Sequence, residues 1–213
     1  MRKVFFFAFM ALSLTAMAQH VKPLTIQIAD PRLDSLRTVY SAEPTMYRAA
    51  LDVVAKDLMT NAGELKAAKA ELREEQNHAK EIDNTLKEAA KTVSNLKVLY
   101  SKEEAELKSL QRTIEQQQRS VAGKSSLTKE ARDNYVQTLD KHQKDLGYAL
   151  RELAERQRSM ADFETTIQNA TTSHQAYWLE VNQKAADLAA LEQLHKDRVA
   201  IVKAEQKTAK NMQ

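Results

Sequence analysis

One feature constrains this chain more than any other: apolar residues recur at every seventh position along most of its length. In the first half the series runs without a break from Leu51 to Val121, and in the second half it runs from Leu139 to Val202, with histidine at two of its positions. We call these the a positions. A sustained seven-residue repeat keeps one stripe of a helix facing a partner only when the helices wind around each other. The repeat therefore predicts a left-handed coiled coil of two long helices.

The second seam of each helix mixes apolar residues with polar and charged ones. This seam consists of the d positions, three residues after each a position. In the first half it includes Asn61, Glu75 and Glu103, and in the second half it includes Arg156 and Lys184. Because a d position faces the partner helix, the sequence predicts a core that is apolar along one seam and interrupted along the other.

The composition is typical of long helices. Glycine and proline occur three times each in 213 residues, cysteine is absent, and all three prolines precede the long heptad series. A chain without cysteine forms no disulfides, so its stability must come from packing alone. We therefore predict an all-α fold: a long antiparallel coiled-coil helical hairpin preceded by a short extended segment and a short helix.

The stretch SVAGKSSL, residues 120–127, separates the two heptad series. Its small residues suit a turn, and Gly123 suits the left-handed conformation that often ends a helix. We predict a first long helix over 44–122, a turn over 123–126 and a second long helix over 127–213, because a short connection makes neighbouring helices antiparallel. The alternative is a helix that continues through the glycine and dimerises. The candidate N-caps of the second helix are Ser125, Ser126 and Thr128.

The two series also predict which residues face each other. Pairing residues whose numbers add to 249 places an a position opposite a d position throughout and centres the hairpin on the turn. Leu110 then meets Leu139, and Glu75 meets His174, a pair that protonation of the histidine at about pH 6 would strengthen. At 1.5 Å per residue, each arm of about 75 residues would be about 110 Å long.

Residues 19–43 are expected to form an extended tether and a short helix. Apolar and polar residues alternate in the stretch LTIQI (24–28), which is typical of an extended segment, and the chain offers no second run of this kind to pair with it. Asp30 followed by Pro31 is a typical helix start, because aspartate caps free amides and proline suits the first helical position.

The first 18 residues have the pattern of a secretory signal peptide. Two basic residues precede an apolar run of eleven residues, and Ala16 and Ala18 form a cleavage motif before Gln19. The run is too short for a membrane-spanning helix, which needs about 20 residues. After cleavage, 30 basic residues would balance 29 acidic ones, so no strong field would attract nucleic acid. We expect a periplasmic or secreted protein.

Apolar residues that face away from the partner helix indicate contacts with other proteins. Leu179 falls at such an outward position, within AYWLEV (176–181), a stretch with much aromatic surface. Tryptophan and tyrosine are frequent anchors of protein interfaces. The turn is the second candidate surface. The candidate partner contacts are Val121, Lys124 and Leu127 at the turn, and Tyr177, Trp178 and Leu179 in the second helix.

Catalytic and metal-binding patterns are weak. Glu-x-x-His, which supplies ligands in di-iron helical bundles, occurs at Glu75 with His78 and at Glu192 with His195. The two copies would lie far apart in the hairpin and could not share a metal. The chain lacks a nucleophile elbow and a phosphate-binding glycine loop, and a slender hairpin offers no enclosed pocket. We therefore expect no metal, no cofactor, no small-molecule substrate and no enzymatic activity.

Two functions fit these features. The first is an exported coiled-coil protein that acts as a spacer or adaptor in the bacterial cell envelope. It would bind other proteins or further copies of itself, bind no nucleic acid, and reach the membrane only through a partner. The alternative is a periplasmic holdase, a chaperone whose projecting helical hairpins hold unfolded clients. Such chaperones resemble this chain only in architecture.

Overall fold

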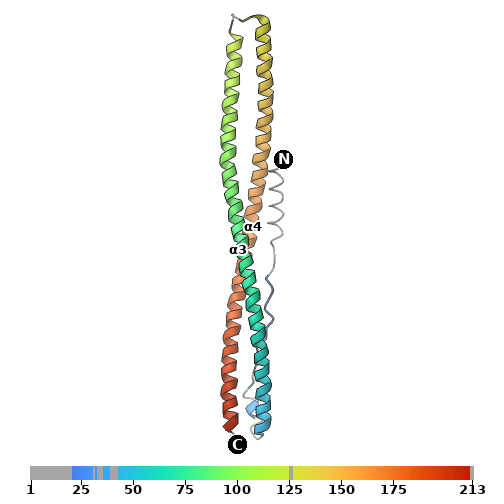
Figure 1. The fold of residues 1–213 in the computed structure, drawn as a ribbon, viewed down its shortest axis with the longest axis vertical. Helices are drawn as coiled ribbons and strands as arrows, with labels where there is room; N and C mark the ends of the chain where they lie inside the picture. The colour runs from blue at the N-terminus through green and yellow to red at the C-terminus, as the bar shows by residue number, and fades with distance from the viewer. Residues whose placement is uncertain (1–20, 31, 33–35, 39–42, 125–126, 212–213) are drawn as a thin grey trace. The chain divides into compact units, whose positions relative to one another are not determined.

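The computed structural model describes residues 21–30, 32, 36–38, 43–124 and 127–211; the expected signal peptide lies outside them. Helix α3 spans Pro44–Ala122 and helix α4 spans Lys129–Asn211 (Figure 1). The two helices pack against each other in antiparallel directions, which confirms the all-α hairpin. The chain turns between them, so α3 does not continue through Gly123 as a single longer helix.

The ends of the helices follow from local chemistry. At the start of α3, the carbonyl of Glu43 accepts a hydrogen bond from the Tyr47 amide at 3.1 Å, so Pro44 occupies the first helical position, where its missing N–H costs nothing. At the start of α4, the Thr128 hydroxyl accepts from the Ala131 amide at 3.3 Å, which confirms one expected cap. Ser125 and Ser126 lie outside the described residues.

Gly123 does not adopt the expected left-handed conformation. Its φ is not positive. The end of α3 is closed instead by the Lys124 amide, which donates to the Val121 carbonyl at 3.2 Å. This bond spans three residues rather than four, and tightening the last turn in this way satisfies a carbonyl that would otherwise lack a partner.

The hairpin divides into two compact units, which we describe separately. The turn unit contains residues 84–172, and the terminal unit combines residues 18–83 with 173–213. In each unit the a positions form the core, as the heptads predict. The buried a residues are Leu86, Val93, Tyr100, Ile114, Val121, Leu139, Leu146, Leu153, Met160 and Ile167 in the turn unit, and Leu51, Leu58, Leu65, Leu72, Ala79, His174, Val181, Leu188 and Val202 in the terminal unit.

Contacts between the helices show that the expected register is wrong by one heptad. Four polar pairs join e positions, which flank the seam, and in each pair the residue numbers add to 261, whereas the expected register requires 254 for such pairs. Facing a and d positions therefore add to 256, not 249. The four pairs are Lys69 with Glu192, Lys97 with Glu164, Glu104 with Gln157, and Gln118 with Gln143.

The asymmetry of the turn explains this shift. In the observed register, Ala122 at the end of α3 lies opposite residue 134, whereas α4 already begins at Lys129. The first turn of α4 therefore extends past the end of α3, and Arg132 donates from Nη2 to the Lys124 carbonyl across it at 2.9 Å. Leu139 accordingly packs with Ile114 rather than with Leu110, which is half exposed.

The expected short helix also begins later than the sequence suggested. Residues 36–38 are helical, and the Leu36 amide donates to the Arg32 carbonyl at 3.0 Å. Arg32 has a φ of 37°, in the left-handed region, so the helix cannot run through it from Pro31, which itself lies outside the described residues. The Asp30 carboxylate accepts from the Arg32 amide at 3.3 Å, which makes Asp30 part of a turn rather than the helix cap.

Candidate interaction site

The most distinctive site of the terminal unit is a groove that holds an extended piece of the same chain. Residues 21–30 have neither helical nor strand structure, and they pack against the core of the α3–α4 pair. Ile28 is buried, and Val21, Leu24, Ile26 and Ala29 are partly buried against the same cluster. The alternation seen in the sequence thus places apolar side chains on the helices. We call the surface beneath this segment the segment groove.

Asn61 makes the central polar contacts of the segment groove. It occupies a d position of α3 and is buried. Its Oδ1 accepts from the Ala29 amide at 2.9 Å, and its Nδ2 donates to the Gln27 carbonyl at 3.1 Å. The same Nδ2 donates to the Glu64 carboxylate at 2.9 Å. The amide group of Asn61, which would disturb an apolar seam, thus makes two hydrogen bonds to the segment and one to Glu64.

Two charged side chains of α4 contact the backbone near the ends of the segment. The guanidinium of Arg198, another seam position, donates to the Ile28 carbonyl. A carboxylate oxygen of Glu180 accepts from the Val21 amide at 3.3 Å. Glu180 thus accepts a hydrogen bond near the start of the segment, and Arg198 donates one near its end. A segment bound in the reverse direction would present different backbone groups to these two side chains, so the groove favours one direction.

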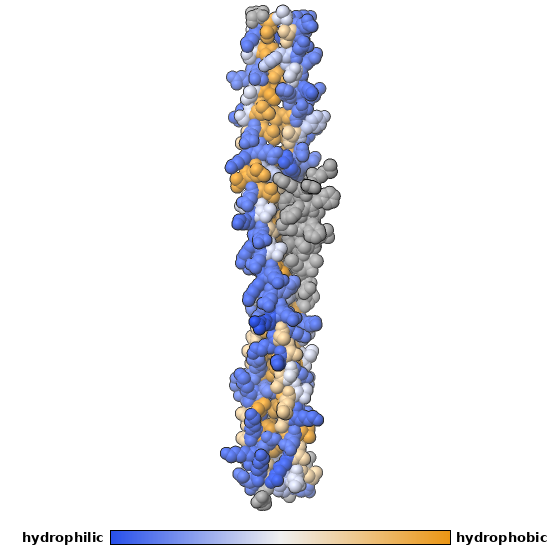
Figure 2. Space-filling view, in the orientation of Figure 1, coloured by the Kyte–Doolittle hydropathy of each residue, from blue (hydrophilic) through white to orange (hydrophobic). Residues whose placement is uncertain are grey.

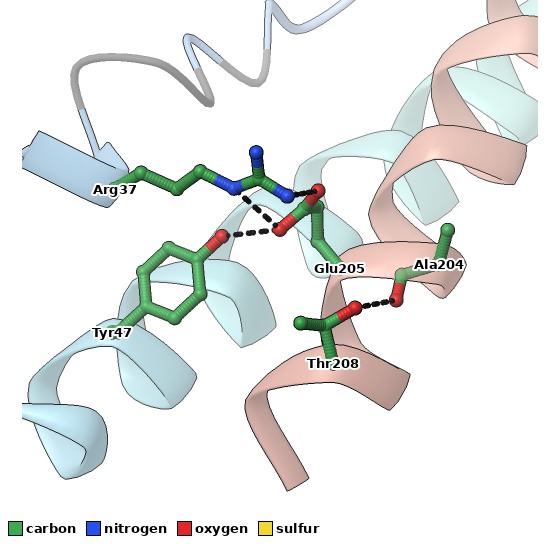
Figure 3. A network of polar contacts seen from close by, with 5 residues as sticks. All are labelled: Arg37, Tyr47, Ala204, Glu205 and Thr208. Carbon is green, nitrogen blue, oxygen red and sulfur yellow. Dashed lines mark hydrogen bonds and ion pairs between the residues drawn. The ribbon is translucent and has the colours of Figure 1, made fainter. Parts of the chain in front are cut away.

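A polar cluster fixes the chain just after the segment (Figure 3). Both Arg37 and Tyr47 point at the carboxylate of Glu205: Arg37 donates two hydrogen bonds at 2.5 and 3.1 Å, and the Tyr47 hydroxyl donates one at 2.7 Å. The hydrogen bond to Glu205 raises the pKa of Arg37 above its usual value. The cluster joins residues 36–38 to the start of α3 and to the last part of α4.

A second group of buried side chains in the terminal unit consists of histidines and aromatic rings. Both ring nitrogens of His174 are buried without a hydrogen-bond partner, and so is Nε2 of His78. The ring centroids of Trp178 and His174 are 6.3 Å apart, and those of Tyr177 and His78 are 6.4 Å apart. Burial lowers the pKa of His174 below its ordinary 6.5; Asp83 opposes this shift, and His78 adds to it.

The expected pair between Glu75 and His174 does not form. Glu75 instead receives hydrogen bonds from Nζ of Lys184, at 2.8 and 2.9 Å, in line with the shifted register. Protonation of His174 therefore cannot strengthen a contact with Glu75. A charge on His174 would be buried in a place that lowers its pKa, so acid should weaken the fold here rather than support it.

The expected partner contacts differ widely in exposure. Tyr177 in the terminal unit and Val121 in the turn unit are both buried and present almost no surface. Leu179 is 71% exposed, and Trp178 beside it is partly buried against the core. At the turn, Lys124 is exposed and Leu127 is partly buried. Of the two predicted surfaces, the one on α4 thus offers Leu179 and the outer part of Trp178.

Apolar residues also reach the surface elsewhere in patches between hydrophilic ones, as the face in Figure 2 shows. The sequence predicts no enclosed pocket, whereas the terminal unit contains a cavity of about 370 Å³. His195 lies in its wall and donates from Nε2 to the Leu58 carbonyl at 2.8 Å. The other lining residues are Ala55, Met59, Ala62, Val199, Val202, Lys203 and Gln206.

The Glu-x-x-His motifs are occupied by other contacts. Glu75 binds Lys184, and Glu192 binds Lys69 at 2.9 Å, which lowers the pKa of Glu192. Within the described residues, no group of three or more histidine, aspartate or glutamate side chains is placed to hold a metal ion. Within the same residues, neither long helix contains an apolar stretch sufficient to span a membrane.

Sequence reasoning identified the extended segment but missed its binding site. Asn61 and Arg198 both lie at d positions, where the heptads predict only interruptions of an apolar seam. A signal was present, because a polar residue on a seam needs a partner, and a nearby segment without any strand to pair with offers free backbone groups. Comparisons of the chain with protein-family models, curated proteins and solved structures found no match.

Proposed function

We propose that this chain is an exported coiled-coil protein that acts as a spacer or adaptor in the bacterial cell envelope. The observation that carries the proposal is the outer face of α4, where Leu179 is 71% exposed next to a partly buried tryptophan, Trp178. An aromatic anchor beside an exposed leucine is typical of protein interfaces. The signal-peptide pattern of residues 1–18 supports export, and the near-neutral mature chain argues against nucleic acid as the partner.

The interface can be tested by photo-crosslinking in cells of the source organism. A crosslinking amino acid at Leu179 should give a discrete adduct with one protein. The same residue at Leu99, another exposed leucine on the other helix, is the matched control and should give none. Failure to form an adduct at Leu179, together with a monomeric state in light scattering, would contradict the adaptor proposal. Export is checked separately by mass spectrometry, which should find Gln19 as the first residue.

A holdase function is the second candidate, and the segment groove supports it. The terminal unit already holds an extended stretch of alternating apolar residues, the conformation in which unfolded β-rich clients expose themselves. A holdase should suppress aggregation of a denatured client at about equimolar ratio. An adaptor should leave aggregation unchanged while still forming the Leu179 adduct, so the two assays separate the candidates.

A further inference from the structure

The segment groove recognises the backbone of its occupant. Asn61 contacts the carbonyl of Gln27 and the amide of Ala29, two residues apart. In an extended chain, groups spaced in this way point to the same side whatever the side chains are. The side chain of Gln27 is exposed, and the contacts of Arg198 and Glu180 also go to backbone atoms. The polar part of the groove therefore suits any extended segment.

The side-chain requirement of the groove is short and simple. Ile28 is the residue of the segment that is buried, while Leu24 and Ile26 are partly buried on the same side. These three positions alternate, as side chains on one face of an extended chain must. An occupant thus needs an apolar residue at the Ile28 position and apolar or small residues two and four positions before it.

The present occupant is held in a way that allows exchange. Among the described residues, the backbone of residues 21–30 makes no hydrogen bond with another backbone group; its bonds go to the side chains of Asn61, Glu180 and Arg198. The segment packs on the same cluster as the buried a residues Leu58, Leu65 and Leu72 of the helix pair. Release of the segment breaks these side-chain contacts and no hydrogen bond within a helix, and the Glu205 cluster still joins Arg37 to α4.

We propose that the segment groove is a binding site for an extended segment of another protein, with apolar side chains at alternate positions, and that residues 21–30 are its intramolecular occupant. The incoming segment binds in the same direction, with its backbone amides toward Glu180 and its carbonyls toward Arg198. The groove adjoins the surface around Leu179, since Glu180 contacts Val21 and Trp178 packs on the same cluster as the segment. The two proposals are therefore tested by different measurements: a crosslink at Leu179 for the adaptor, and peptide binding that depends on Asn61 for the groove.

The test uses the purified protein and a labelled, end-blocked peptide with the sequence of residues 21–30. Fluorescence anisotropy measures peptide binding to the wild-type protein and to the variant Ile28→Asp. In this variant the segment should leave the groove, because an unpaired carboxylate is unfavourable at the buried position of Ile28. The variant should bind the peptide about tenfold more tightly than the wild-type protein, because the competing occupant is gone. Adding Asn61→Leu should then weaken binding about tenfold, because two backbone contacts are lost.

Matched controls distinguish this result from a general loss of structure. Asn77→Leu changes an exposed asparagine on the same helix and should leave peptide binding unchanged. A peptide carrying Ile28→Asp should not bind. In case the protein variant is poorly folded, hydrogen exchange on the wild-type protein gives a second measurement: excess peptide should speed exchange of the Ala29 amide. Equal affinity of all variants, or no binding together with unchanged exchange at Ala29, would overturn the proposal.

Discussion

The buried ion pair between Glu75 and Lys184 provides the sharpest test of the packing in the terminal unit. The Lys184 side chain is 4% exposed and that of Glu75 is 18% exposed, and Nζ lies 2.8 Å from the nearer carboxylate oxygen. Removing one partner of a buried pair leaves an uncompensated charge, which typically costs 3–5 kcal/mol. We expect Glu75→Leu to lower the free energy of unfolding by about 3 kcal/mol, the lower end, because part of Glu75 still reaches water.

The double variant should recover most of this loss. In Glu75→Leu with Lys184→Leu no charge remains buried, and two leucines can pack on the seam, so stability should return to the wild-type value or exceed it by about 1 kcal/mol. The exposed pair of Lys97 and Glu164, with side chains 49% and 38% exposed, is the control, and its coupling energy should stay below about 1 kcal/mol.

Urea unfolding measures all of these variants. Circular dichroism follows the helices, and the chain's single tryptophan, Trp178, reports on the terminal unit specifically. A cost below about 1 kcal/mol for Glu75→Leu, or a coupling energy no larger than that of the exposed pair, would refute the idea that Lys184 depends on Glu75 for its burial.

Three further predictions follow from the same structure. The wild-type protein should lose stability as pH falls below about 6.5, because the lowered pKa of His174 means that the unfolded chain takes up a proton there and the folded chain does not. His174→Leu should remove this loss. Melting curves at pH 7.5 and pH 5 check the prediction, and equal pH dependence of the two proteins would contradict it. The chain has no cysteine, so introduced cysteine pairs can report the register. The pair Leu107→Cys/Ala149→Cys fits the observed register and should form a disulfide faster than Leu107→Cys/His142→Cys, which fits the register expected from the sequence. Faster oxidation of the second pair would show that the expected register is the right one. Gly63→Ala should stabilise the protein by about 0.5–1 kcal/mol in urea unfolding, because a Cβ there meets no atom within 4 Å and glycine is unfavourable inside a helix; a loss of stability would indicate a contact that the structure lacks.

The fold was predictable because the heptads are long, whereas the heptads alone do not fix the register, because a seven-residue repeat fits equally well after a shift of seven. Centring the hairpin on the turn chose the wrong solution. Charges on the seam contained the missing information: Glu75 and Glu103 are 28 residues apart in α3, and Arg156 and Lys184 are 28 apart in α4. Only one register pairs both acids with both bases, and it is the observed one.

The candidate site was less predictable for a different reason. The alternation of residues 24–28 indicated an extended segment, but the partner of such a segment is normally sought among strands. Here the partner is a pair of helices, and Asn61 contributes to it through a side chain rather than a backbone. The heptad pattern alone does not distinguish an asparagine that fixes the register of two helices from one that binds an extended segment of the chain.

The position of the segment groove also has a consequence for the order of folding. Near the turn, Gln118 contacts residues only 22 and 25 positions away, whereas Ile28 and Arg198 are separated by 170 positions. Closing a short loop costs less entropy than closing a long one, so the helices should pair from the turn outward. Residues 21–30 leave the ribosome early, yet they can dock only after Glu180 and Arg198 of α4 have been made. The part of the described chain that is made first is therefore the last to reach its place, and it remains exposed to other proteins throughout synthesis.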